Sequence, residues 1–163
     1  MSSGNGSTRA QALANTFEVA NKEFMGFVES CSDEVWGKVS EGEQWSVGVI
    51  AHHVAAGHSA IAGLVHLIGN GQAIPPLTAE QLNESNEQQA QKAAHCTQAE
   101  VLELAQKNGA QAVAMISSLS DEQLDRTAHL PFFGGAASSQ DVIENVLIGH
   151  LTGHFASINA TVG

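Results

Sequence analysis

Apolar residues recur at intervals of three and four along most of this chain, and the every-second-residue alternation of a half-buried strand is almost absent. The first periodic stretch begins at Ser7 or Thr8 and ends near Ser30. Its apolar side carries Leu13, Phe17, Ala20, Phe24 and Phe27. Ser46 can cap a second helix, which the run from Gly69 to Pro76 ends. The pattern predicts two long amphipathic helices in the first half of the chain.

The second half repeats this arrangement after a polar connection. Residues 78–96 are rich in Gln and carry little apolar stripe, which predicts an exposed helix or a mobile crossover covering one end of the fold. Thr97 with Glu100 forms a capping box for a third main helix, and Ser138 with Asp141 can cap a fourth. The segment HLPFFGGAASS between them is typical of a loop. Four main helices with a long crossover between the second and third predict an all-α fold, a four-helix bundle.

Length and composition limit the classes of function. The 163 residues are expected to form a single domain over residues 1–163, in which the Ser/Gly/Asn-rich residues 1–7 are a disordered lead-in without the features of a signal peptide. Seventeen acidic against six basic residues give a net charge of −11, which argues against partners such as nucleic acid or an anionic membrane. Cys31 and Cys96 form no CxxC motif, which suits a reducing cytoplasmic location.

Residues 47–69 contain no Asp, Glu, Lys or Arg and are long enough to span a bilayer. Their four histidines and their one-sided apolar pattern favour a buried helix of the bundle over a membrane span.

Histidines occupy the apolar face of two predicted helices, where an imidazole needs a physical reason. On a helix of 100° per residue, the inward stripe of the second main helix passes through His53. The residues within about 60° of it are Val49, Ala56, Ala60, Leu64 and Leu67. The other five histidines lie about 100° to 140° away on the same helix or in other segments, and are expected at the surface or in loops: His52, His58, His66, His95 and His129.

His150 and His154 are four residues apart on the apolar face of the last main helix. Two imidazoles on adjacent turns, about 6 Å apart along the axis, can bind one metal ion, and His53 on a facing helix completes a triad. Three neutral nitrogen ligands leave the ion its full charge and an open position, so it can lower the pKa of a water or a thiol. The HxxxH spacing alone is weak, because eight histidines produce such pairs by chance and inward histidines are often hydrogen-bonded core residues. Both interpretations stay open at this point.

Three other kinds of site do not fit the sequence. A di-iron bundle needs Glu-x-x-His motifs, but Leu147 and Leu151 stand three residues before His150 and His154. The run HLTGH lacks the Glu of HExxH, which removes the general base of a thermolysin-like protease. The glycine-rich segments have neither the spacing nor the Lys of a phosphate-binding loop.

Four phrases in combination, WSVGVIAHHV, EQLNESNEQ, LSDEQLDR and GHLTGHFASI, resemble the DinB/YfiT-like superfamily of metalloenzymes over about residues 8–159. That superfamily includes DinB proteins, thiol-dependent transferases and mycothiol-dependent maleylpyruvate isomerases. The resemblance implies that His53, His150 and His154 hold a divalent metal ion, usually zinc or nickel, with Trp45 eight residues before His53 favouring it over His52. The sequence ends soon after the last ligand helix, without the further C-terminal domain expected of the isomerases, which argues against that isomerase activity.

The triad and the resemblance lead to a first hypothesis, a metal-dependent enzyme that activates a low-molecular-weight thiol or a water for attack on a small electrophilic substrate. A second hypothesis is a non-catalytic helical module for metal binding or dimerisation, and a homodimer is expected under either. In a third, the histidines only stabilise a polar core. No catalytic base can be named from the sequence. Arg9 and Arg126 could bind a substrate carboxylate but are expected at the surface, and Trp45 is expected to pack at the start of its helix.

Overall fold

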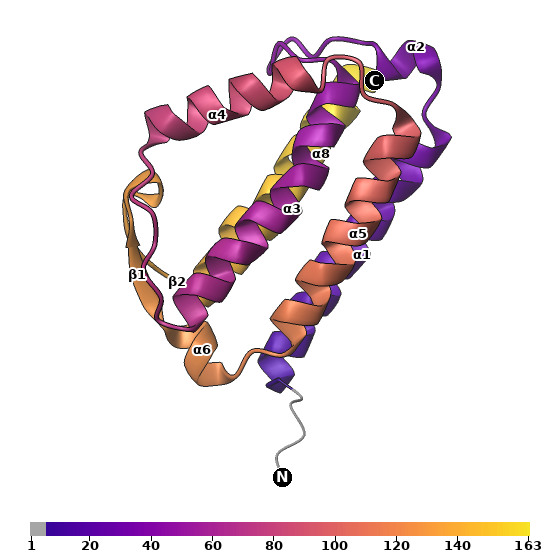
Figure 1. Ribbon diagram of the computed structural model, residues 1–163. Coiled ribbons are helices and arrows are strands. Elements are labelled where there is room, and N and C mark those ends of the chain that lie inside the picture. Colours follow the sequence, from indigo (N-terminus) through magenta and orange to yellow (C-terminus); the bar gives the residue numbers. More distant parts are fainter. Residues whose placement is uncertain (1–5) are drawn as a thin grey trace.

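The computed structural model describes residues 6–163, and four long helices form its core (Figure 1). The first three are α1 (Thr8–Ser30), α3 (Val47–Gly69) and α5 (Gln98–Ser117). The fourth is continuous through α7 (Ser139–Asp141), the π-helical η2 (Val142–Ile148) and α8 (Gly149–Val162). α5 packs against α1 and α3, and α3 also packs against η2 and α8. The predicted all-α four-helix bundle is confirmed.

The long connection between α3 and α5 determines the direction of the helices. It contains α4 (Ala79–Lys92), in which only Ala90 is buried, so the exposed helix expected in residues 78–96 is present. This connection returns the chain to the end of the bundle at which α3 begins, and α3 and α5 therefore run in the same direction (Figure 1). Two short α-helices also occur among residues 6–163, α2 (Asp33–Trp36) before α3 and α6 (Asp121–Asp125) after α5.

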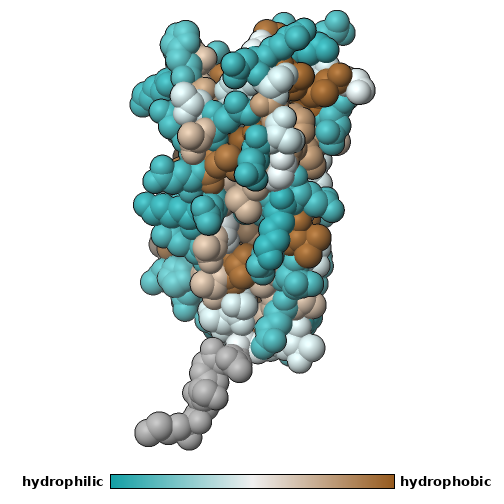
Figure 2. Space-filling model, turned by 90° about the vertical axis from the view of Figure 1, so that its right-hand side faces the viewer, coloured by the Kyte–Doolittle hydropathy of each residue, from teal (hydrophilic) through white to brown (hydrophobic). Residues whose placement is uncertain are grey.

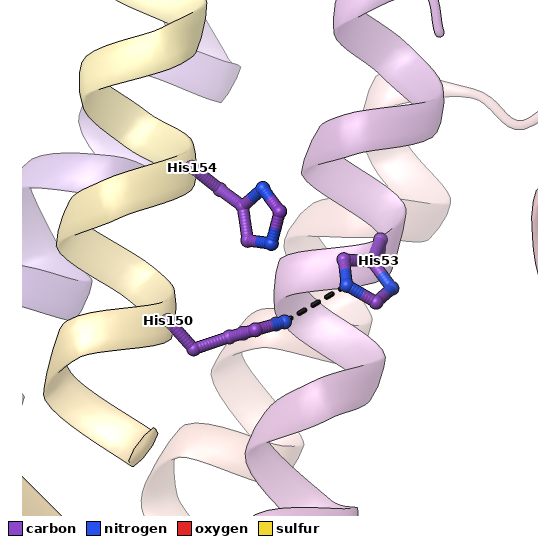
Figure 3. A group of neighbouring side chains, drawn as sticks. All are labelled: His53, His150 and His154. Atoms are coloured by element: carbon purple, nitrogen blue, oxygen red, sulfur yellow. Dashed lines mark hydrogen bonds between the residues drawn. The ribbon is translucent and has the colours of Figure 1, made fainter. Parts of the chain in front are cut away.

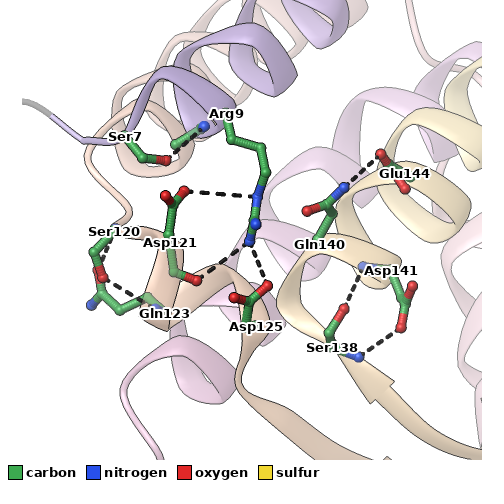
Figure 4. A network of polar contacts seen from close by, with 11 residues as sticks. Ser7, Arg9, Ser120, Asp121, Gln123, Asp125, Ser138, Gln140, Asp141 and Glu144 are labelled. Atoms are coloured by element: carbon green, nitrogen blue, oxygen red, sulfur yellow. Dashed lines mark hydrogen bonds and ion pairs between the residues drawn. The ribbon is translucent and has the colours of Figure 1, made fainter.

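Side-chain caps fix the starts of the main helices where the sequence predicted them. The Ser46 hydroxyl accepts a hydrogen bond from the backbone N–H of Val49, 3.2 Å away, at the start of α3. Reciprocal capping boxes begin α5 and the last helix. They are formed by Thr97 with Glu100 and by Ser138 with Asp141, the latter drawn in Figure 4.

The expected lead-in over residues 1–7 falls mostly on residues 1–5, which lie outside the described part of the chain. Ser7 is described: its hydroxyl caps α1, and its backbone N–H donates to the carbonyl of Leu119 at 2.9 Å.

The segment HLPFFGGAASS, expected as a loop, forms most of a β-hairpin. Strands β1 (Thr127–Leu130) and β2 (Gly135–Ser138) pair antiparallel around the 3₁₀ turn η1 (Pro131–Phe133). Gly134 and Gly135 have φ angles of 86° and 157°, which side-chain-bearing residues rarely adopt. Strands of four residues are too short for alternation to be read, and the glycines that permit the turn had indicated only a loop.

Within residues 6–163, α3 is the one helix long and apolar enough to cross a membrane by length and composition, and half of its most apolar stretch is buried. Its contacts with α5, η2 and α8 account for that apolar composition. On the outer face of the bundle beside α1 and α5, hydrophilic side chains predominate and hydrophobic ones are scattered between them (Figure 2). α3 is therefore the core helix that the sequence favoured, and the outer helices are amphipathic.

His58 is buried, and the prediction that it lies at the surface is wrong. Its side chain is fully buried, its Nε2 lies 2.8 Å from Oδ1 of Asn21, and the ring of Phe17 meets it edge to face at 4.9 Å. Asn21 Nδ2 donates to the carbonyl of Ala105, so Oδ1 is the acceptor and His58 Nε2 carries the proton. The phase calculation assumed one buried face of α3, whereas this helix buries a second face against α1 and α5.

The remaining histidines outside the triad divide into two groups. His66, His95 and His129 are exposed, as predicted, and His52 is half-buried.

Candidate metal centre

The three histidines singled out in the sequence converge in the structure. His53 on α3 faces His150 and His154 on α8 (Figure 3). One ring nitrogen of each histidine lies within 4.8 Å of a ring nitrogen of each of the other two. The Nε2 atoms of His53 and His150 are 2.8 Å apart. All three side chains are half-buried. The structure thus confirms that they lie together, and that they bind an ion stays a prediction.

His150 and His154 share one face of α8 because they are four residues apart, and the π-helix η2 directly precedes them. Buried and half-buried residues recur every four positions along this helix: Val142, Val146, His150, His154 and Ile158. In an α-helix each step of four residues advances the face by about 40°, so the four steps would rotate the stripe by about 160°. The wider i→i+5 turns of η2 offset the part of this rotation that falls within residues 142–148, before His150. A sequence calculation on an ideal helix cannot reveal this adjustment.

Gly57 provides the space that the His150 ring occupies. A Cβ at Gly57 would lie 2.7 Å from Cε1 of His150, well inside van der Waals contact. This residue is one turn after His53 on the same helix, and the sequence analysis did not identify it. The available signal was a glycine in the middle of a helix, where it costs about 1 kcal/mol relative to alanine.

Trp45 packs against the cluster from the start of α3. Its ring centroid lies 5.4 Å from that of His53, with the planes inclined at 65°. Trp45 therefore packs at the start of the helix, as expected, and the residue that it packs against is His53 of the triad.

Burial keeps two of the three imidazoles uncharged. It is the main cause that lowers the pKa of His53 from 6.5 to about 4 and that of His150 to about 3, and repulsion from His154 acts in the same direction on both. At pH 7 both rings are neutral, so each presents a lone pair without first releasing a proton.

The donor set fits a divalent metal ion. Two imidazole nitrogens that bind one tetrahedral zinc at about 2.0–2.1 Å are about 3.3 Å apart, and the 2.8 Å separation of His53 and His150 Nε2 is near that value. The second ring nitrogens of these two residues, Nδ1, are buried and have no hydrogen-bond partner among the described residues. Three imidazoles without a thiolate suit zinc, nickel, iron or copper. The ion would be held by His53, His150 and His154.

Glu43 is the carboxylate that the sequence analysis missed. Its Oε1 lies 2.5 Å from Nδ1 of His154, and both side chains are about one-fifth exposed, at 21% and 22%. Its second oxygen, Oε2, is buried and has no partner among the described residues. Glu43 belongs to the loop between α2 and α3, 111 positions before His154, and no local pattern connects the two.

The two arginines considered as substrate-binding residues have structural contacts elsewhere. Arg9 forms ion pairs with Asp121 and Asp125 (Figure 4). Arg126 donates from its guanidinium to the carbonyl of Gly69 at 2.8 Å, at the end of α3. That position is about 24 Å along the helix from His53, so this arginine does not serve the cluster.

Two surface grooves are lined by neighbours of the cluster. The larger, of about 500 Å³, lies between residues 38–42 and α8 and includes Ser157, three residues after His154. The smaller, of about 250 Å³, lies between α4 and the start of α3 and includes Trp45. The crossover thus lines the smaller of the two grooves, next to Trp45, and the hairpin segment lines neither of these two.

Known proteins with a similar sequence or fold include members of the DinB superfamily. The model of the DinB superfamily matches residues 16–158. No curated protein matches the sequence. Among solved structures, YfiT from Bacillus subtilis, described as a probable metal-dependent hydrolase with an unusual four-helix bundle topology, aligns with a TM-score of 0.76 at 18% identity, covering 95% of this chain and 87% of YfiT.

A mycothiol-dependent maleylpyruvate isomerase aligns with a TM-score of 0.74 at 12% identity over 91% of this chain, and this chain spans 60% of the isomerase. At these identities the structural likeness shows the fold. The family match covers most of the sequence, and the chain belongs to the DinB superfamily.

Proposed function

We propose that this protein is an enzyme dependent on a divalent metal ion, zinc or nickel, that activates a low-molecular-weight thiol or a water for attack on a small electrophilic substrate. The observation that carries this proposal is the convergence of His53, His150 and His154 at a half-buried position. The ion, when bound, supplies a Lewis acid that lowers the pKa of a thiol or a water.

The chain's own residues prepare this chemistry. His53 and His150 are neutral at pH 7 and leave the charge of the cation uncompensated. Trp45 shields one side of His53 from water, which strengthens electrostatic interactions at the centre. The two relatives motivate the two candidate nucleophiles. YfiT is called a probable metal-dependent hydrolase, which suggests water, and the isomerase is called mycothiol-dependent, which suggests a thiol.

The proposal also covers the cellular location and the oligomeric state of the protein. Cys31 and Cys96 are both free thiols, which suits the reducing cytoplasm, and we expect a homodimer in solution. Light scattering coupled to size-exclusion chromatography measures the second expectation directly.

Elemental analysis of untagged protein, purified without added metal, tests the proposal. About one ion per chain is expected in the wild type and none in the variants His53→Ala and His150→Ala. His66→Ala, which removes an exposed histidine from the same helix, is the matched control and should keep the ion. A folded wild type that binds neither zinc nor nickel after reconstitution would overturn the proposal.

The metal-loaded protein is then assayed with common bacterial thiols, and with water alone, on a panel of small electrophiles. Product formation that is lost in His150→Ala supports an enzyme. Metal binding without any product across the panel would favour the non-catalytic module instead.

A further inference from the structure

The short contact between Glu43 and His154 indicates where the proton lies on this imidazole. A carboxylate only accepts hydrogen bonds, so at 2.5 Å from Oε1 the Nδ1 of His154 must be the donor. With Nδ1 engaged in this way, Nε2 is the atom left for the cluster, and Figure 3 shows the His154 ring turned toward the other two imidazoles. Histidines that bind metals commonly donate their second N–H to a carboxylate in this arrangement.

The loop that carries Glu43 is fixed in place by its own hydrogen bonds. The backbone N–H of Gln44 donates to the carbonyl of Ser40, and the N–H of Ser40 donates to the carbonyl of Trp45, both at 2.8 Å. The N–H of Glu43 itself donates to the hydroxyl of Ser40 at 3.3 Å, and Ser40 is 2% exposed. The carboxylate is therefore held toward His154 before any ion binds.

Gln44 adds a second sign that this loop conformation is specific. Its φ of 62° lies in the left-handed region, and it is the one residue other than glycine with positive φ among residues 6–163. Such a conformation costs of order 1 kcal/mol or more, and persists where the surrounding contacts require it. The residue beside the strained position is the one whose side chain reaches the cluster.

Among the described residues, Glu43 is the single polar partner of an Nδ1 atom in the triad. The Nδ1 atoms of His53 and His150 have no hydrogen-bond partner, whereas Nδ1 of His154 has a carboxylate. Both side chains are about four-fifths buried, so water screens their interaction weakly. A negative charge one imidazole away from the ion also favours the binding of a cation.

Resting on the proposed metal site, we propose that Glu43 is a positioning residue that keeps the proton on Nδ1 of His154 and thereby directs Nε2 to the ion. Replacing Glu43 with Gln removes both the acceptor that keeps the proton on Nδ1 of His154 and the negative charge near the ion, because a Gln side chain can donate or accept and carries no charge. Loss of such a partner lowers metal affinity by about 10- to 100-fold in comparable sites.

The test compares Glu43→Gln with Glu41→Gln, a matched control that removes an exposed carboxylate two residues earlier in the same loop. Zinc affinity is measured by competition with a chromophoric chelator, and folding is checked by thermal unfolding. Affinity should fall at least tenfold in Glu43→Gln and stay within twofold in Glu41→Gln. Equal affinity in the wild type and both variants would overturn the inference.

The second readout is the tautomer of His154, observed through the ¹⁵N shifts of its ring at pH 9 in the metal-free protein. The wild type should carry the proton on Nδ1, and Glu43→Gln should show a mixture; an Nε2 proton in the wild type would overturn the inference. This measurement needs no variant, so it decides even if Glu43→Gln fails to fold. The two failures can be told apart. If the proposed function is wrong, the wild type binds no zinc, whereas the tautomer of His154 still shows whether Glu43 holds the proton on Nδ1.

Discussion

Acidification is expected to destabilise the metal-free protein through His58. This imidazole is fully buried between α1, α3 and α5, and burial lowers its pKa from the ordinary 6.5 to about 4. Above pH 6.5 the residue is neutral in the folded and unfolded states and has no effect on the pH dependence. Between pH 6.5 and pH 4, His58 is protonated in the unfolded chain but stays neutral in the folded protein, so the free energy of unfolding falls as the pH falls.

The size of this effect follows from the two pKa values. At about 1.4 kcal/mol per pH unit, the gap between 6.5 and about 4 amounts to about 3 kcal/mol once the pH is below 4. At pH 5 the linkage relation gives about 2 kcal/mol of that loss. Against a typical domain stability of 5–15 kcal/mol, such a loss is readily measured.

The assay is urea unfolding in the presence of a chelator, at pH 8 and at pH 5, on the wild type and on His58→Gln. The amide of Gln can still donate to Asn21 but does not titrate. Because His53 and His150 also have lowered pKa values, only the difference between wild type and variant isolates His58. The wild type should lose about 2 kcal/mol more than the variant between the two pH values. His66→Gln, exposed on the same helix, should reproduce the wild-type curve.

A constant difference between the wild type and His58→Gln, within 0.5 kcal/mol or about the fitting error of such curves, would refute the reasoning. It would mean that the buried site accepts the proton, for example through a water that reaches Nδ1, the ring nitrogen without a partner among the described residues.

Three further outcomes are expected. Gly57→Ala places a Cβ 2.7 Å from His150 Cε1 and should weaken zinc binding about tenfold in a competition titration, whereas Gly63→Ala, with no atom within 4 Å of the new Cβ, should leave it unchanged. Equal affinities in these two variants would contradict the role assigned to Gly57. Gly109→Ala brings a Cβ to 2.3 Å from Nδ2 of Asn21 and should lower the free energy of unfolding by about 1–3 kcal/mol in urea, so an unchanged midpoint would count against the tight packing of this network. Added zinc should raise the thermal unfolding temperature of the wild type in a concentration-dependent way, and no shift at saturating zinc would speak against binding to the folded state.

The sequence predicted the helices well because their signals are local. A cap and its partner are three residues apart, as in the Ser138 and Asp141 box, and an amphipathic stripe is read within one helix. The His150 and His154 pair is visible for the same reason, since residues four apart share a face. His53 required both the phase of its helix and the resemblance of the surrounding phrases to a known family.

The residues around the triad could not be predicted, because their roles depend on contacts between distant segments. Glu43 meets His154 across 111 positions, and Gly57 matters only because His150 packs over it. His58 was assigned to the surface because a single helix does not reveal how many neighbours will cover it. The hairpin was missed because its strands are too short to show a period.

The sequence by itself determined the class of the fold, the ends of its main helices and the three imidazoles of the candidate centre, since hydrophobic periodicity and capping act between near neighbours. The tertiary structure decided which polar groups surround that centre and which histidines have a pKa lowered by burial. Burial depends on the packing of helices that are remote in sequence, and it is the main cause that lowers the pKa of His53 and of His58. The same packing brings Glu43 to within 2.5 Å of His154.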